Sequence, residues 1–445
     1  MWGSLFVTVC RHTKLQWEEG IVTSNHGAIL KAIGPGVLYA ATAVGASHLV
    51  QSTRAGASYG LALVVLILLT YVAKYPAFRF GAQYPSATGY SLLHGYKNQG
   101  QWAVAIYIVI ALGTMFAAVP AVTLITAGLA KVAFGLQMDT LGISICILTA
   151  CSLILIIGGY HLLDRLVKVL MVVLAIATLV ATALVIPKID WAVSGMIMPR
   201  GVVSADVFFI VALLGMMPTS VDISVWHSLW SVARARDSGH RPTQSESLLD
   251  FHIGYVGAFI LAICFVLLGA GVMHNSGIQF EASAAGFAAQ LIDLYKQSLG
   301  EWSGTLIGIV AVAVMFSTVL AGLDGYPRAA VSLVKLHSRQ EQQEDEQKSL
   351  SISKTVYVST LIALVLGSIL ILYLFVTSLK LVIDIASTIL FLFAPVIAWL
   401  NHRVMTSSQF PSNARPGRGL LILSAIGVIW MAAFSAYFLY LKILA

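Results

Sequence analysis

Charged residues are scarce in this chain. They make up 10% of its 445 residues, while hydrophobic residues make up 58%, and a soluble domain carries about 25% charged residues. A composition this apolar excludes an ordinary soluble fold. The formal net charge is +7, yet the basic residues lie in short loops between apolar runs and form no continuous basic face. Nucleic acid is therefore not an expected partner.

Cysteines are few, and the common catalytic motifs are missing. Three of the four cysteines lie inside apolar runs and one stands alone near the N-terminus; they are Cys146, Cys151, Cys264 and Cys10. This spacing gives neither a disulfide framework nor a metal-binding CxxC pair. The sequence contains no HExxH, GxSxG or Walker motif and no GxGxxG in a βαβ context. We therefore expect neither an enzyme nor a resident cofactor.

Eleven apolar runs dominate the sequence. Each is long enough to cross a hydrocarbon core about 30 Å thick as an α-helix. They fall near residues 33–57, 60–81, 102–129, 139–159, 163–187, 203–231, 251–274, 302–325, 353–376, 380–401 and 418–441. We therefore predict an all-α integral membrane protein with about eleven transmembrane helices. Residues 1–30 form a cytoplasmic tail in this interpretation, and the two longest loops are 232–250 and 329–352.

The basic residues indicate the orientation of the chain in the bilayer. With the N-terminus in the cytoplasm, most of the 26 Lys and Arg residues fall on the cytoplasmic side, as the positive-inside rule requires. An odd number of helices then places the C-terminus outside, and the plasma (inner) membrane is the expected location. Seven basic residues are exceptions to this rule. One of them, Arg54, falls within the membrane, and the others fall on the outer side: Lys131, Lys188, Arg200, Lys296, Lys380 and Lys442.

The first and sixth apolar runs are interrupted near their middle. The first carries the small residues Gly45, Ala46 and Ser47, directly followed by His48. Glycine and proline at mid-span release backbone groups, which must find new partners in a protein-lined cavity. The interrupting residues of the sixth run are Gly215, Pro218, Thr219 and Ser220, with Asp222 just beyond them.

The two interruptions occupy corresponding positions if the chain contains two halves of five helices. We predict a ten-helix core at 31–401, with one repeat at about 31–190 and the other at about 200–401. A loop and an eleventh helix follow at 402–445. Paired interrupted helices mark the substrate site of many secondary transporters near the middle of the bilayer. We therefore expect a small solute to bind between the first and sixth helices.

Ionisable residues at membrane depth are candidates for function, because each costs about 2.5–3.5 kcal/mol to insert. His48 and Asp222 follow the two breaks and are expected to face each other, either as a substrate site or as a structural pair. A histidine titrates near neutral pH, so a proton or coupling path is a further hypothesis. The candidates for that path are His48, Asp222, His227, Asp324 and Asp384.

Several of these residues also have structural interpretations. Arg54 is expected to pair or to reach water at the outer boundary. Asp324 lies near what the sequence indicates is a helix end and is expected to pair with Arg328, four residues later. Asp384 follows Lys380 by four residues, which favours an exposed pair.

The residues around the two breaks resemble those of a known family. A GPG motif at residues 34–36 precedes the first break by eleven steps, and AGASYG follows it at residues 55–60. The sixth run contains Met217 before Pro218, and His227 before Ser228. With YHLLDRLVKVL before the fifth run and ILFLFAPVIAWLNHRVM in the tenth, nearly the whole chain resembles the NRAMP divalent-metal transporters. The resemblance implies the LeuT fold: two inverted five-helix repeats plus one extra helix, with a cytoplasmic N-terminus.

The metal signature of that family is altered in this chain. Its DPGN motif aligns with residues 45–48, so the metal-binding aspartate becomes Gly45 and the asparagine becomes His48. Met217 matches the family's metal-binding methionine, but three extra residues separate it from His227. Counted back from His227 instead, Ser220 takes the place of the methionine and Asp222 that of a histidine. In either register Asp222 is a candidate for the missing carboxylate. The resemblance thus implies a metal site of His48, Asp222 and Met217. The substrate-binding residues that we expect are Gly45, Ser47, His48, Met217, Thr219, Ser220 and Asp222.

These observations predict a secondary transporter that moves a small solute by alternating access. The first substrate hypothesis is a divalent metal cation coupled to protons. A carrier of the same fold for a non-metal solute, such as an amino acid or an organic ion, uses the same polar residues and stays open. A membrane sensor that binds a ligand without moving it is a third hypothesis, which the short loops disfavour.

Overall fold

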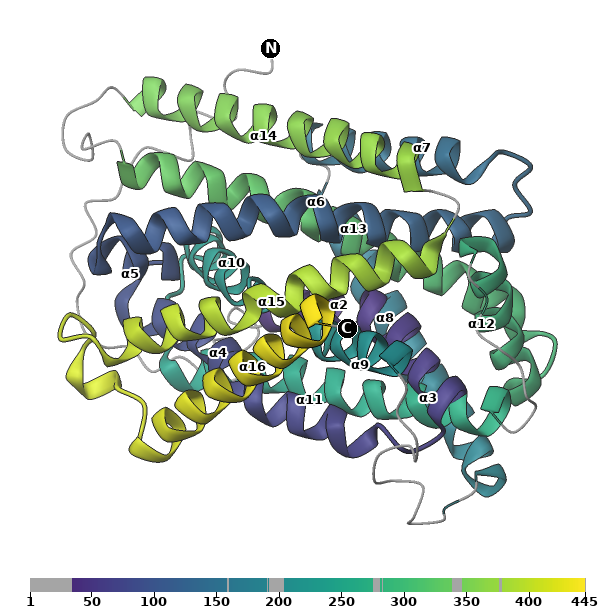
Figure 1. Ribbon diagram of the computed structural model, residues 1–445. Helices are drawn as coiled ribbons and strands as arrows, with labels where there is room; N and C mark the ends of the chain where they lie inside the picture. The colour runs from purple at the N-terminus through teal and green to yellow at the C-terminus, as the bar shows by residue number, and fades with distance from the viewer. Residues whose placement is uncertain are drawn as a thin grey trace.

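The computed structural model describes residues 34–157, 160–189, 191, 204–274, 281, 283–337, 346–375 and 378–444. These residues form helices joined by short connections, and no strand occurs among them. Figure 1 shows the long helices running side by side, roughly horizontally in the view. The predicted tail at 1–30 lies outside the described residues.

Within the described residues, nine helices are long and apolar enough to cross a membrane. They are α4 (Val64–Thr88), α6 (Gln101–Ala133), α7 (Thr140–Ile157), α8 (Tyr160–Val185), α11 (Gln244–Leu268) with its π-helical extension η4 (Gly269–His274), α13 (Ser303–His337), α14 (Glu346–Phe375), α15 (Leu379–Thr406) and α16 (Arg418–Leu444). Each coincides with one of the predicted runs. The all-α membrane fold is therefore confirmed.

The first and sixth predicted spans are each divided. The first consists of α2 (Pro35–Ala43), the π-helical segment η1 (Val44–Ser52) and α3 (Thr53–Tyr59). The sixth consists of α9 (Ser204–Met216) and α10 (Ile223–Ser238), separated by residues 217–222. The breaks thus lie where the small residues and Pro218 indicated.

Two shorter helices were not predicted, because they are too short and too polar to form a span. They are α5 (Leu92–Gln99), after α4, and α12 (Ala284–Leu299), after α11. The order of a divided span, a long helix, a short helix and three long helices therefore occurs twice along the chain. This double order supports the predicted five-plus-five arrangement, whose residue boundaries stay a prediction.

The predicted end of the eighth span was wrong. Helix α13 continues through Pro327 to His337, because a proline is tolerated inside a membrane helix when neighbouring groups satisfy the freed carbonyl. The predicted loop 232–250 is also shorter than expected. Helix α10 extends to Ser238, and α11 begins after Thr243, which forms a capping box with Glu246.

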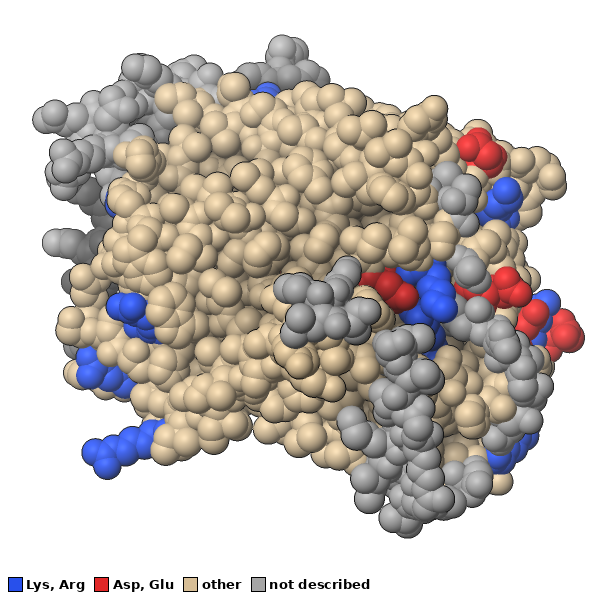
Figure 2. Space-filling view, viewed as in Figure 1, with Lys and Arg blue, Asp and Glu red and all other residues tan. Residues whose placement is uncertain are grey.

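The outer helices present apolar side chains to their surroundings. Leu366 and Leu370 of α14 are 62% and 59% exposed, and Ile422 of α16 is 60% exposed. Figure 2 shows a broad uncharged area, with most charged side chains near the left and right margins and one charged group right of the centre. An apolar belt between charged ends is the surface of a protein that spans a bilayer.

The first span packs closely against α11. A Cβ atom added to Gly254 of α11 would lie 2.2 Å from the Gly36 carbonyl oxygen, so the two backbones are in direct contact. Asp250, one turn earlier, accepts hydrogen bonds from the backbone N–H groups of Gly34 (3.1 Å) and Gly36 (2.6 Å) at the N-terminus of α2. Small residues permit such contacts between membrane helices, and the carboxylate favours the positive end of α2.

We predict that Gly254→Ala lowers the thermal stability of the protein in detergent, because overpacking costs about 1–3 kcal/mol. Gly257→Ala is the matched control on the same helix, since a Cβ atom there meets no atom within 4 Å. Thermal unfolding followed by size-exclusion chromatography compares the two variants. Equal stability of both would contradict the close contact between α2 and α11.

Candidate functional site

The break in the sixth span begins at a proline. The last regular hydrogen bond of α9 joins the Met217 N–H to the Leu213 carbonyl oxygen, at 2.9 Å. The next helical donor would be residue 218, but proline has no N–H. The Leu214 carbonyl oxygen therefore has no partner within its own helix. The chain turns at residues 217–222 and becomes helical again at Ile223.

The break in the first span lies at Gly45, whose φ of −66° and ψ of −126° leave the helical region. Helix α13 approaches this position closely. A Cβ atom on residue 45 would lie 2.8 Å from Thr318 Oγ1 and 2.9 Å from its Cγ2. Thr318 Oγ1 in turn donates a hydrogen bond of 3.1 Å to the Ala41 carbonyl oxygen. The side chain of Thr318 thus fills the space that an aspartate at position 45 would need.

The two breaks meet directly. The Ser47 hydroxyl lies 2.9 Å from the Pro218 carbonyl oxygen. Beside this contact lies a cavity of about 60 Å³, enough for a few water molecules or one small solute. Its walls come from both interrupted spans and from α6, α13 and α15. Met216 and Trp226 line it, and most of the lining surface is apolar. The hydroxyl-bearing residues in its wall are Thr42, Ser47, Thr219, Ser220, Thr318 and Tyr326.

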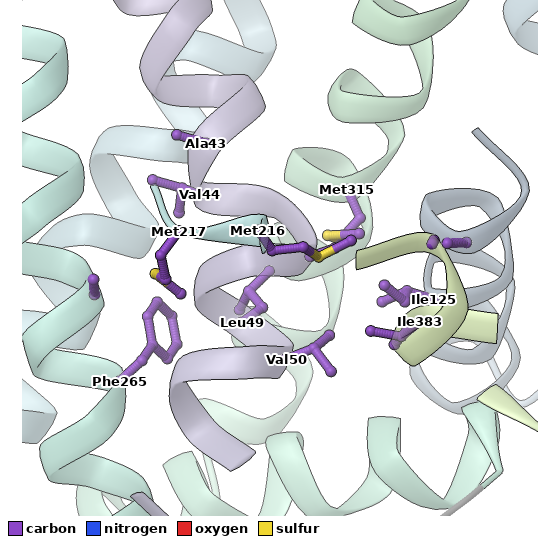
Figure 3. Close-up of a cluster of buried hydrophobic side chains, with 14 of the residues drawn as sticks. Ala43, Val44, Leu49, Val50, Ile125, Met216, Met217, Phe265, Met315 and Ile383 are labelled. Carbon is purple, nitrogen blue, oxygen red and sulfur yellow. The ribbon is translucent and has the colours of Figure 1, made fainter. Parts of the chain in front are cut away.

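The two adjacent methionines lie in different surroundings. Met216 lines the cavity, whereas Met217 is fully buried outside it. Figure 3 shows Met216 directed toward Met315 of α13 and Met217 directed toward Phe265 of α11. Ser52 is the polar neighbour of Met217, with its hydroxyl 3.9 Å from the Met217 sulfur. The methionine that the family resemblance selected is therefore not the one at the cavity.

His48 is also held away from the cavity. Its Nε2 lies 2.9 Å from the Ala258 carbonyl oxygen of α11 and 2.8 Å from the Tyr71 hydroxyl of α4. Its Nδ1 lies 2.7 Å from the Ser47 hydroxyl. Both ring nitrogens thus have partners within the protein.

Asp222 lies on the opposite side of the break, immediately before α10. Its Oδ2 accepts hydrogen bonds from Thr114 of α6 (3.0 Å) and Tyr326 of α13 (3.3 Å). Its Oδ1 is buried and has no hydrogen-bond partner among the described residues, although Ser220 lies beside it. Because Ser220 and Tyr326 both line the cavity, Asp222 is in contact with the cavity wall.

The structure does not bring the predicted metal ligands together. His48 and Met217 face α11, whereas Asp222 faces α6 and α13. The described residues contain no group of three or more His, Cys, Asp or Glu side chains that could hold a metal ion. The three residues lie on separate segments, His48 on η1, Met217 directly after α9 and Asp222 directly before α10, and these segments direct them to different helices.

The outer arginine pairs with a residue far away in sequence. Arg54 and Asp384 form a bidentate ion pair, with N–O distances of 2.6 and 3.3 Å. The Arg54 guanidinium also lies 4.4 Å from the centre of the Phe209 ring. Arg54 is paired, as expected, but the predicted Asp384–Lys380 pair is replaced by this contact, because α3 packs near the start of α15.

The remaining ionisable candidates have separate environments. Asp324 pairs with Arg328 at 2.5 Å, as predicted, and also accepts hydrogen bonds from Tyr357 (2.9 Å) and Trp230 (3.3 Å). His227 is 1% exposed and lies among the aromatic rings of Tyr39 and Phe251. Neither residue lines the cavity.

The sequence analysis missed Lys74 of α4. Its ammonium donates hydrogen bonds to the carbonyl oxygens of Leu214 (2.7 Å) and Gly215 (3.0 Å), and its side chain is fully buried. Lys74 lies inside the second apolar run, seven residues before its predicted cytoplasmic end at residue 81, so it was grouped with the loop charges. A lysine that deep in an apolar run was the available signal.

Comparison with known proteins identifies the family. The profile of the family described as natural resistance-associated macrophage protein-like (Nramp) matches residues 36–441. The chain belongs to this family. An uncharacterised protein of Pasteurella multocida (strain Pm70) is 32% identical over 414 residues, which is 92% of each chain. Membership confirms the predicted class, a multi-pass membrane transporter and not an enzyme.

Solved structures show the same fold. A mutant of the Eremococcus coleocola manganese transporter is similar with a TM-score of 0.66 at 14% identity, over 94% of this chain and 88% of that chain. A Na⁺-coupled sialic acid symporter is similar with a TM-score of 0.55 at 12% identity, over 90% and 89% of the two chains. The Nramp chain described here thus has the LeuT-like fold that the sequence predicted.

The contact between Gly45 and Thr318 gives a testable prediction. We expect Gly45→Ala to lower thermal stability, because the new methyl group meets the Thr318 side chain within 3 Å. Thr318→Ala removes the two nearest atoms, so the double variant should recover most of the loss of about 1–3 kcal/mol. A double-mutant cycle of unfolding temperatures measures this coupling. Strictly additive effects would show that Thr318 does not restrict position 45.

Proposed function

We propose that this Nramp-family protein carries a metal cation across the membrane by alternating access. The cation binds in the cavity between the two interrupted spans. The observation that carries this proposal is the meeting of both breaks at one buried cavity, through Ser47 and Pro218. Family membership supports the substrate class, and the structurally similar Eremococcus coleocola protein is a manganese transporter.

The cavity offers oxygen and sulfur ligands to such a cation. Ser47, Thr219 and Ser220 provide hydroxyl oxygens, and Met216 provides a thioether. Manganese and similar ions prefer carboxylate, carbonyl and water oxygens, while thioethers suit softer ions. Asp222 supplies the negative charge in this proposal, because its Oδ1 has no hydrogen-bond partner in the described part of the chain and its Oδ2 accepts a hydrogen bond from the cavity-lining Tyr326.

The other predicted ligands enter the proposal differently. Gly45 provides the break and no ligand atom. His48 and Met217 join the cation only in another state of the cycle, since both are held outside the cavity here. A transporter that alternates between two states changes such contacts by moving helices against each other.

Proton coupling through His48, Asp222, His227, Asp324 and Asp384 is part of the same proposal. Asp324 and Asp384 are ion-paired with arginines, so each must leave its pair before it can carry a proton. Both pairs are only partly buried, and solvent near them lowers the cost of separation. Movement of the helices that carry these pairs is therefore a requirement of this path.

The proposed orientation follows from the basic residues. We place the N-terminus in the cytoplasm and the C-terminus outside, in the plasma (inner) membrane. The three arginines Arg234, Arg236 and Arg241 at and beyond the end of α10 then face the cytoplasm. Positive charge on that side is what the positive-inside rule requires.

A non-metal solute is the second candidate substrate. The lining of the cavity favours it, because the lining residues include no carboxylate, imidazole or thiolate. A hard divalent cation without a direct carboxylate ligand pays a large dehydration cost. A small organic cation would instead find a methionine, a tryptophan and hydroxyl groups in the cavity.

We predict that Asp222→Asn lowers uptake of Mn²⁺ into proteoliposomes by about thirtyfold or more, because loss of a buried charge that pairs with a cation costs about 2–5 kcal/mol. Asp237→Asn is the matched control, since Asp237 is an exposed acid on the same helix. Unfolding temperatures of both variants establish that they are folded. Wild-type uptake by Asp222→Asn would remove this residue from the site.

The wild-type protein decides between the two substrate classes in the same assay. A panel of Mn²⁺, Fe²⁺, Zn²⁺ and Mg²⁺ is tested against a panel of amino acids and organic cations, each at two pH values. Uptake of a metal, or competition by one, supports the first class. Uptake of an organic solute with no effect of any metal would reject it in favour of the second.

A further inference from the structure

At the C-terminal end of α9, backbone carbonyl oxygens without a partner in their own helix lie close together inside the membrane. The last carbonyl oxygens of a helix have no partner within the helix, and they carry about half a negative charge together. Pro218 adds to this, because it removes the donor that would otherwise bind the Leu214 carbonyl. In lipid each such group must be satisfied within the protein.

Lys74 satisfies two of these groups at once. Its ammonium is bonded to the Leu214 and Gly215 carbonyl oxygens and forms no ion pair with a described carboxylate. In transporters with interrupted helices, the C-terminal ends of half-helices coordinate monovalent cations. The buried Lys74 ammonium, bonded to carbonyl oxygens at the end of α9, has the same kind of environment as such an ion.

Close packing fixes the position of these carbonyls. A Cβ atom on Gly215 would lie 2.1 Å from the Ser387 carbonyl oxygen and 2.9 Å from the Phe391 Cβ of α15. The end of α9 is thus pressed against α15 on one side and faces Lys74 of α4 on the other. This contact prevents Gly215 from moving toward α15.

We propose that the Leu214 and Gly215 carbonyl oxygens form a monovalent-cation site that is filled by the Lys74 ammonium. The protein thereby contains its own cation at the end of α9 and needs no free alkali or ammonium ion there. Removal of the lysine side chain opens the site to a small cation from solution. For transport, this inference rests on the proposed function; for stability, it does not.

The test compares two ways of removing the charge. Lys74→Ala leaves space for an ion, whereas Lys74→Met fills the same space with an uncharged chain. Unfolding temperatures are measured in choline chloride, which is too bulky to enter, and in NaCl, KCl and methylammonium chloride. Lys97→Ala is a control, because the Lys97 ammonium of the short helix α5 bonds one carbonyl oxygen, that of Leu336 in the last turn of α13, and not the end of α9.

We expect Lys74→Ala to unfold at a lower temperature than wild type in choline chloride. Its unfolding temperature should rise by about 3 °C or more between 10 and 300 mM of at least one small cation. Lys74→Met, Lys97→Ala and wild type should show no such difference between salts. Cellular K⁺ supports folding of Lys74→Ala during expression. The proposal would be overturned if all the salts, choline chloride included, changed the unfolding temperature of Lys74→Ala equally. It would also be overturned if Lys74→Ala were not folded in any of these salts.

Transport provides a second and separate measurement. Uptake of the substrate by Lys74→Ala should require Na⁺, K⁺ or methylammonium, whereas wild type works in choline. Failure of wild type to carry any metal would reject the proposed function and leave the stability result standing. Cation-dependent stability without cation-dependent uptake would confirm the site and exclude its role in the cycle.

Discussion

The missing N–H of Pro218 is the constraint on which the centre of this protein depends. It ends α9 in the middle of the membrane and leaves carbonyl groups that water cannot reach, each of which would cost several kcal/mol if unpaired. Lys74 binds the carbonyls of Leu214 and Gly215 before the break, and Ser47 contacts the carbonyl of Pro218 within it. The carbonyl groups around this one proline therefore join α4 and η1 to the end of α9.

The charges of the site are consequently placed beside the cavity and not in it. Thr318 fills the space around Gly45, so no carboxylate can enter from the first span unless α13 moves. The negative charge comes instead from Asp222 and the positive charge from Lys74, on different helices. A cation bound in the cavity, as we propose, would be attracted by the first charge and repelled by the second.

The sequence predicted the spans well and the orientation of individual side chains poorly. Hydrophobic length and mid-span glycine and proline are local signals, so the helices and both breaks could be located. Helices α5 and α12 lack a membrane-length run, and α13 continues through Pro327 although a proline often ends a helix. Which of Met216 and Met217 faces the cavity depends on one step of about 100° around the helix. Neither spacing nor family resemblance fixed that step, because the chain between the break and His227 is longer than in the family.

The same contacts limit which helices can move separately. Ser47 joins the two breaks, Lys74 joins α4 to the end of α9, and Arg54 joins α3 to α15 through Asp384. Separating any of these groups inside the membrane leaves a carbonyl or a charge without a partner. Motions that carry the linked helices together avoid that cost. Asp222 links the sixth span to α6 and α13 in the same way, so a motion of that span relative to these two helices must exchange the Asp222 hydrogen bonds for others.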